Sequence, residues 1–128
     1  MKRLLKIIGL AVLTVAAAIV GLSEALDYRN QAEFNAVVWR NALKCGYDGC
    51  DAECTRGHMV RDLTWKYLNP GISRSEVVAL LGAADSPPAA KSLSYSLGMC
   101  SGFRMDYDSL VLLFDDRDAL IGSRTVQH

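Results

Sequence analysis

Four cysteines and one nearby histidine are the residues of this chain best suited to chemistry. Cys45, Cys50, Cys54 and His58 have the spacing C-x4-C-x3-C-x3-H, and Cys100 stands alone further along the chain. Four nitrogen and sulfur ligands could hold a structural zinc ion, but the spacing lacks the tight C-x2-C knuckle. An even number of cysteines in a small exported domain instead favours two disulfides.

The pairing of these cysteines stays open at this stage. An iron–sulfur cluster or a redox-active pair would also use thiols, but the chain has no C-x-x-C motif. If two disulfides form, Cys100 must pair with Cys45, Cys50 or Cys54. We therefore predict these four residues as disulfide partners, with no metal ligands and no cofactor.

The other polar residues offer little catalytic chemistry. The five aspartates between residues 106 and 118 lack the spaced oxygen ligands of an EF-hand, so they are interpreted as a solvated hairpin tip. His58 is the only histidine besides the terminal His128, and no G-x-S-x-G motif accompanies it. We predict that the chain is not an enzyme and has no catalytic residues.

The N-terminus predicts export. Three basic residues within the first six positions precede an apolar run over residues 7–22, as in a signal peptide or a membrane anchor. Small residues permit cleavage after Ala25, whereas a retained anchor would span the membrane through residues 4–22. The positive charges place the rest of the chain outside the cytoplasm. We expect an inner-membrane anchor facing the periplasm, or a soluble periplasmic domain if the signal is cleaved.

The charge beyond Ala25 argues against nucleic-acid binding. Three of the 14 basic and one of the 14 acidic side chains lie before that point, which leaves a net charge of −2. A nucleic-acid-binding domain would show a basic surface instead. We divide the chain into a signal peptide or anchor (1–25), a helix with a cysteine-containing loop (26–57) and an α+β domain (58–128).

Apolar spacing predicts helices in the first two thirds of the chain. Residues 26–44 carry apolar side chains at helical intervals, with Val37 and Val38 on the apolar face. The cysteine-containing loop separates them from a second helix over residues 56–68, with Thr55 as a possible N-cap.

The stretch NPGISRSEVVALLG, which begins at residue 69, predicts a short helix with both ends specified. Ser73 and Glu76 have the spacing of a capping box. Val77 and Val78 fall on the apolar face, and Gly82 stands where a terminating glycine belongs.

The period then changes from that of a helix to that of a strand. Residues 92–97 alternate strictly, and residues 110–114 form an apolar run typical of a central strand. A hairpin turn over residues 115–118 leads to a return strand over 119–126, with Gly122 as a bulge or close-approach site. Helices followed by three strands predict a two-layer α+β domain with a three-stranded antiparallel meander.

The stretch MVRDLTWKYLNPGISRSEVVALLGAAD, from residue 59, resembles the helix-turn-helix of the SmpA/OmlA family, the BamE-like domain. Gly71-Ile72-Ser73, Leu80-Leu81-Gly82 and Asp85 occupy the places of the family's motif, and the later strands also fit. The resemblance covers residues 58–126. It implies an α-α-β-β-β domain, related in shape to the β-lactamase inhibitor protein, that works as a binding or scaffold module. The family's best-known member belongs to the machine that inserts β-barrels into the outer membrane.

The chain departs from this family pattern at its N-terminus. No cysteine follows the apolar run directly, so the lipid attachment of the family's lipoproteins has no acceptor here, and the cysteine loop is an addition. We predict a non-enzymatic periplasmic or envelope binding or scaffold module in outer-membrane or envelope protein assembly. The alternatives are an exported enzyme-inhibitor-like binding protein and a redox or zinc protein built on residues 45–58.

An edge strand is the predicted place for a partner. Such a strand offers unpaired backbone groups to which another chain can add a strand. The segment after Pro87-Pro88 alternates apolar with small polar residues, as expected of an edge strand. We therefore predict that an envelope protein partner contacts Ser92, Ser94, Tyr95 and Ser96.

Overall fold

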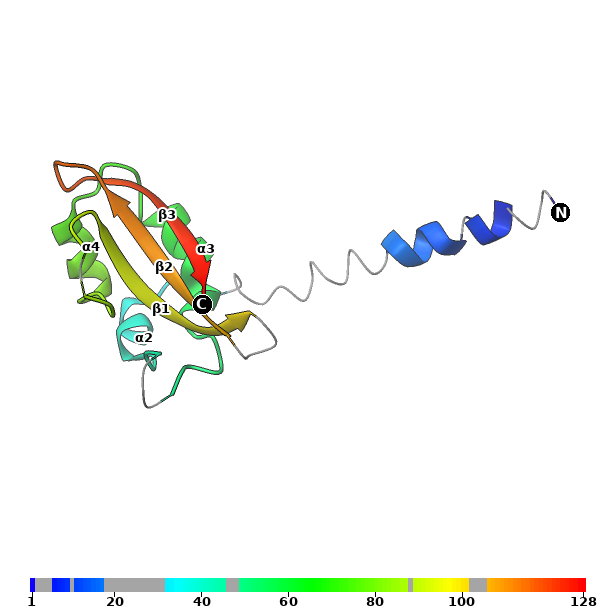
Figure 1. The fold of residues 1–128 in the computed structure, drawn as a ribbon, viewed down its shortest axis with the longest axis horizontal. Helices are drawn as coiled ribbons and strands as arrows, with labels where there is room; N and C mark the ends of the chain where they lie inside the picture. Colours follow the sequence, from blue (N-terminus) through cyan, green and yellow to red (C-terminus); the bar gives the residue numbers. More distant parts are fainter. Residues whose placement is uncertain (2–5, 10, 18–31, 46–48, 88, 102–105) are drawn as a thin grey trace.

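The computed structural model describes most of the chain, including a helical N-terminal stretch and a folded α+β part (Figure 1). Among the residues described, no helix is both long enough and apolar enough to cross a membrane. The predicted signal or anchor over residues 1–25 therefore stays a prediction, and much of it falls outside the description. The described residues are 1, 6–9, 11–17, 32–45, 49–87, 89–101 and 106–128.

The sheet has three antiparallel strands that follow one another along the chain. They are β1 (Ser92–Ser101), β2 (Asp106–Phe114) and β3 (Leu120–Gln127), in the spatial order β1-β2-β3. The α+β class and the three-stranded antiparallel sheet are thus confirmed, with β2 in the centre. The helices gather on one face of this sheet (Figure 1). Because β2 is central, β1 and β3 form the two edges of the sheet.

The first helix of the folded part, α2 (Ala36–Asn41), is shorter than the predicted helix over residues 26–44. Asn35 starts it, because its side chain accepts hydrogen bonds from the amides of Val37 and Val38. The expected apolar face is wrong, since Val37 and Val38 are exposed and Trp39 is the buried residue. Residues 18–31 of the predicted helix lie outside the description.

The second predicted helix consists of a single 3-10 turn, η2 (Gly57–Met59), followed by α3 (Val60–Lys66). Thr55 does not cap it, because the 3-10 turn has Arg56 at its N-cap position and no side-chain cap. The amide of Thr55 donates to the Asp51 carboxylate. The apolar spacing of this stretch predicts a core face that contains Met59, Leu63 and Tyr67; Met59 and Leu63 are buried, whereas Tyr67 is 40% exposed.

The capped helix α4 (Arg74–Leu81) confirms the capping box. The Ser73 hydroxyl accepts from the amide of Glu76, and the Glu76 carboxylate accepts from the amide of Ser73 at 2.9 Å. The helix ends at Gly82, whose φ of 85° favours glycine. Val78 is exposed rather than buried, because α4 turns only Val77 and Leu81 fully into the core.

The core lies between the helices and one face of the sheet. In register, Leu93 pairs with Leu112 and Tyr95 with Leu110, so large side chains of neighbouring strands pack side by side. The helices contribute the other half of this layer. The buried apolar cluster contains Trp39, Met59, Leu63, Leu68, Val77, Leu81, Leu93, Tyr95, Leu97, Leu110, Leu112, Phe114 and Leu120.

The strands extend further than the sequence predicts. Because β2 begins at Asp106, Asp106 and Asp108 belong to the sheet and not to a hairpin tip, and Asp108 is buried. The hairpin tip itself is held by Asp115, whose carboxylate accepts hydrogen bonds from the amides of Arg117 and Ala119. The register shift lies between Leu120 and Gly122, so the bulge is beside Gly122 rather than at it.

Candidate functional site: the two edges of the sheet

The outward backbone groups of β1 can be identified from one hydrogen bond at its start. The amide of Phe114 donates to the carbonyl of Lys91 at 2.9 Å, so these residues form a hydrogen-bonded pair. In an antiparallel ladder such pairs alternate with pairs that point their backbone groups away. Ser92, Ser94 and Ser96 therefore turn their amides and carbonyls toward the outside of the sheet.

Four of the six outward groups of Ser92, Ser94 and Ser96 are bonded within the chain. The carbonyl of Ser94 accepts from the amide of Asp85 at 2.9 Å. The amide of Ser96 donates to Asp85 Oδ2 at 3.0 Å, and its carbonyl accepts from Arg56 Nη1 at 3.1 Å. The amide of Ser92 donates to the carbonyl of Ala89. The fold itself therefore covers most of this edge.

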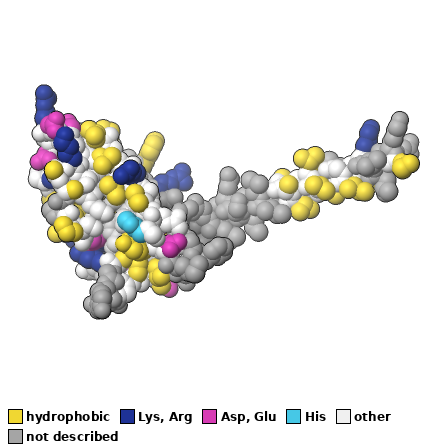
Figure 2. Space-filling model, in the orientation of Figure 1, with side chains coloured by type: hydrophobic (Ala, Val, Ile, Leu, Met, Phe, Trp, Pro, Cys, Tyr) yellow, Lys and Arg dark blue, Asp and Glu magenta, His cyan; other side chains and the backbone are white. Residues whose placement is uncertain are grey.

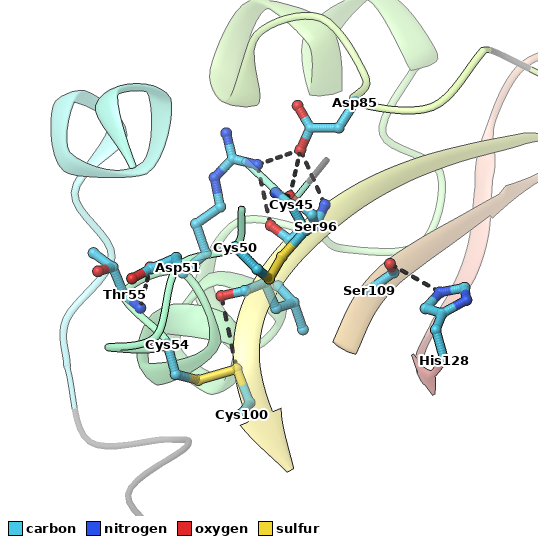
Figure 3. The surroundings of a disulfide bond; sticks show 12 residues. Cys45, Cys50, Asp51, Cys54, Thr55, Asp85, Ser96, Cys100, Ser109 and His128 are labelled. Carbon is cyan, nitrogen blue, oxygen red and sulfur yellow. Dashed lines mark hydrogen bonds and ion pairs between the residues drawn. A yellow bond between two sulfur atoms is a disulfide. The ribbon is translucent and has the colours of Figure 1, made fainter. Parts of the chain in front are cut away.

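Arg56 and Asp85 form a buried ion pair beside this edge (Figure 3 shows Asp85 above Ser96). The Arg56 side chain is 1% exposed and that of Asp85 6%. Arg56 also donates to the carbonyl of Trp39 at 2.7 Å and lies 5.0 Å from the centre of its ring. Lys44 lies 2.9 Å from the other carboxylate oxygen. The pair thus joins α2, the cysteine loop, the segment after α4 and β1.

The surroundings of Asp85 keep it ionised. Burial by itself raises the pKa of this carboxyl. The hydrogen bond from Lys44, the Arg56 charge and the Ser96 amide outweigh that effect, so the pKa lies below its ordinary value. Two buried charges are tolerated here because they pair with each other, hydrogen bonds reach Asp85 Oδ2, and the Lys44 ammonium lies beside Oδ1.

Two disulfides fasten the loop that carries Arg56 (Figure 3). Cys45 is joined to Cys50, and Cys54 is joined to Cys100 at the far end of β1. The prediction of two disulfides, with Cys100 bonded to a loop cysteine, is confirmed. All four thiols are used, so the predicted zinc alternative has no thiolate ligands in this structure.

Two glycines let the loop approach β1 closely. A side chain at Gly57 would overlap both sulfurs of the Cys54–Cys100 bridge. A side chain at Gly98, whose φ is +109°, would come within 2.6 Å of the carbonyl oxygen of Asp51. That carbonyl accepts from the amide of Met99 at 2.7 Å. The loop therefore follows the β1 edge beyond Ser96.

These contacts bear on the predicted partner site. β1 lies at an edge, as expected, but most of the outward backbone groups of Ser92, Ser94 and Ser96 are already hydrogen-bonded within the chain. The carbonyls of Ser94 and Ser96 and the amide of Ser96 all have partners. Tyr95 is fully buried, and its hydroxyl donates to the carbonyl of Gly82 at 3.0 Å. Whether a partner binds Ser92, Ser94, Tyr95 or Ser96 stays a prediction.

The opposite edge, β3, differs in this respect. The amide of His128 donates to the carbonyl of Tyr107 at 2.9 Å, which marks a hydrogen-bonded pair. By the same alternation, Ser123, Thr125 and Gln127 turn their amides and carbonyls outward. Within the part of the chain that the structure describes, no hydrogen bond reaches these outward groups.

The sheet face opposite the helices carries a mixed surface (Figure 2). Val111, Leu113 and Val126 are partly exposed on it. The Tyr107 and His128 rings stack with their centres 4.5 Å apart, and His128 Nε2 lies 3.0 Å from the Ser109 hydroxyl. Figure 2 shows hydrophobic side chains across this side of the sheet, with a histidine beside them. This face borders the open edge at β3.

A hollow of about 420 Å³ lies at the other end of the folded part, beside His58. Glu33 and Glu53 line it together with Val38 and Met59. Over the described ranges, no group of three histidine, cysteine or acidic side chains is placed to hold a metal ion. The hollow brings a histidine, two carboxylates and the Thr55 side chain to one surface.

Sequence reasoning missed the ion pair and the open edge. Asp85 was noticed only as part of a family-like motif, and nothing near Arg56 in the sequence signals its burial. Which of the two outer strands is covered depends on contacts from residues far apart in the chain.

Comparisons with models of protein families, with curated proteins and with solved structures found no match to this chain. The resemblance to the SmpA/OmlA family therefore stays a prediction based on the residues quoted above.

Proposed function

We propose that this protein is a non-enzymatic binding or scaffold module that works outside the cytoplasm. The observation that supports the proposal most is that the polar residues that stand out in the chain have structural roles. Ser73 and Glu76 cap a helix, Arg56 and Asp85 close a strand edge, and Asp115 holds a turn. What the fold leaves unused is one edge and one face of its sheet, and such surfaces serve protein binding.

The disulfides support the proposed location. Disulfides of this structural kind persist in oxidising compartments such as the bacterial periplasm. The basic, apolar N-terminus would deliver the chain there. The same features fit an inner-membrane anchor or a cleaved signal, and a role in envelope protein assembly is the form of the proposal that the SmpA/OmlA resemblance favours.

Affinity capture tests the proposed function. The full chain, tagged after His128 and expressed in a Gram-negative host, is cross-linked in cells, solubilised in mild detergent and captured for mass spectrometry. We expect one or a few envelope proteins in stoichiometric amounts, absent from a bait that carries only residues 1–31. A capture that holds no protein beyond that control, together with turnover of an envelope substrate by the purified chain, would contradict the proposal.

A reporter fusion tests the location separately. A reporter that folds only in the periplasm, attached after His128, should be active. Activity of a cytoplasm-specific reporter at the same position would place the domain on the other side of the membrane.

A further inference from the structure

The open edge begins where another part of the chain stops covering β3. The amide of Leu120 donates to the carbonyl of Ile72 at 2.8 Å, and its carbonyl accepts from the amide of Gly71 at 2.8 Å. The turn before α4 therefore pairs with the first residue of β3 alone. From Ser123 to Gln127 no described residue covers the outward groups in this way, and this length equals that of a short strand.

From Ser123 onward β3 has few of the features that usually protect an edge. Exposed edges are commonly protected by charged side chains, by proline or by a bulge, and the bulge of β3 lies before Ser123. Between Ser123 and Gln127 the sequence is SRTVQ, with Arg124 as its single charge. Across the described part of the chain Arg124 makes no ion pair, and its side chain is exposed.

The two sides of this edge differ in chemistry. Arg124 pairs with Val111 across the ladder and lies on the face opposite the helices, in line with Val126 and Gly122. Ser123, Thr125 and Gln127 lie on the other side, and all three are exposed. A strand added here would place its alternate residues beside an arginine flanked by apolar or small positions on one side, and beside small polar residues on the other.

We infer that Ser123–Gln127 binds an extended segment of a partner protein by strand addition. The segment carries a carboxylate across from Arg124 and apolar side chains two positions to either side. This inference rests on the proposed function and names the surface that it uses. Backbone hydrogen bonds to Ser123, Thr125 and Gln127 hold the segment, and the carboxylate sets its register, because opposite charges directly across a ladder attract.

A second copy of this chain is a poorer occupant of the same edge. β3 contains no aspartate or glutamate, so no pairing of two β3 strands places a carboxylate across from Arg124. One antiparallel register places Arg124 across from Arg124 of the copy, which like charges disfavour. The charge on this edge therefore favours a different, acidic segment.

Synthetic peptides test the inference on the full chain in mild detergent. The probe is fluorescein-labelled Thr-Val-Thr-Glu-Thr-Val-Thr with blocked ends, whose pattern reads the same in both directions. The matched peptides carry lysine in place of glutamate, or N-methyl groups on alternate amides. By fluorescence anisotropy we expect saturable binding of the glutamate peptide, roughly threefold to tenfold weaker binding of the lysine peptide, and none of the methylated peptide.

Variants then assign the binding to β3. Arg124→Glu should reverse the preference, so that the lysine peptide binds better than the glutamate peptide. Arg117→Glu makes the same charge change at an exposed turn residue and should leave the preference unchanged. Thr125→Pro removes an outward amide and should weaken binding at least tenfold, while circular dichroism shows a folded protein.

Three results would overturn the inference. They are equal binding to wild type and folded Thr125→Pro, a peptide preference that Arg124→Glu does not change, and reversible dimerisation that Thr125→Pro abolishes, since the last would assign the edge to a second copy. The proposed function would survive each of these results if cellular capture still returned its partner. Failure of both capture and peptide binding would remove the function as well.

Discussion

The two edges of this sheet differ in how many of their outward backbone groups are hydrogen-bonded within the chain. At β1, a buried ion pair and the segment before the strand bond most of the outward backbone groups, and a disulfide fastens the loop to the strand. At β3, the described residues cover the first residue alone, through the turn at Gly71 and Ile72. An open edge is a hazard for aggregation unless it has a use. The difference therefore indicates that the contacts of β1 serve stability, and it leaves β3 as the edge to which our inference assigns binding.

The closure of β1 depends on groups that are costly to bury. Arg56 and Asp85 lose hydration, and the structure offsets this loss only because each also bonds the backbone of β1 or α2. A half-satisfied pair would be worse than none. We therefore predict that substitutions that break the contacts of β1 lower the free energy of unfolding strongly, and that substitutions at the β3 edge lower it little.

The largest expected effect is that of Asp85→Asn. It leaves the Arg56 guanidinium buried without a counter-charge, and breaking such a pair costs roughly 3–5 kcal/mol. Urea denaturation with two-state analysis measures the loss. The control is Asp118→Asn, because Asp118 pairs with Arg74 at the surface at 2.9 Å, and exposed pairs contribute less than about 1 kcal/mol. Equal losses in both variants would refute the special role of the buried pair.

The same carboxyl predicts a direction for the pH dependence. Because the pKa of Asp85 is lower in the folded chain, its contribution to stability is present above the unfolded-state pKa. It is lost as the pH falls through the folded-state pKa. Urea denaturation at a series of pH values should therefore show the stability difference between wild type and Asp85→Asn shrinking as the pH falls from the unfolded-state pKa through the folded-state pKa.

The disulfides should differ in what they contribute. Cys54–Cys100 closes a separation of 46 residues and Cys45–Cys50 one of 5. In the chain-entropy model their losses are about 4 and about 2 kcal/mol. Thermal unfolding of the two double-serine variants, Cys54→Ser with Cys100→Ser and Cys45→Ser with Cys50→Ser, measures them. If the short bridge proved to matter more, β1 would not be the edge that the covalent link secures.

A matched pair of prolines compares the edges directly. Ser96→Pro removes the amide that bonds the Asp85 carboxylate, and a hydrogen bond to a charged group contributes roughly 1.5–3 kcal/mol. Thr125→Pro removes an amide that faces solvent, the one place in a sheet where proline is tolerated, so we expect a loss below about 1 kcal/mol. Chemical denaturation of both variants measures the two losses of unfolding free energy, and we expect the larger loss for Ser96→Pro.

The local rules of the sequence account for much of the fold. The capping box at Ser73 and Glu76 was predictable because both partners lie within one turn of each other. The alternation at Leu93, Tyr95 and Leu97 gave the core face of β1. The presence of two disulfides followed from cysteine number and expected export.

What could not be predicted depends on partners far apart in the chain. Arg56 and Asp85 are 29 residues apart, and neither position has a pattern that requires burial. Helix α2 begins only after Asn35 because the Asn35 side chain caps its first turn, and apolar spacing alone gave no sign of this. Which outer strand is covered could not be predicted, because strand order does not say what lies beside an outer strand.

Hydrogen exchange followed residue by residue by NMR tests the comparison most directly. The amide of Ser96 is bonded to a buried carboxylate, whereas that of Thr125 faces solvent at an open edge. We predict strong protection of Ser96, close to that of the core amides, and exchange at Thr125 near the rate of an unfolded peptide. Similar protection at both positions would contradict the account, because it would show that β3 is covered as firmly as β1.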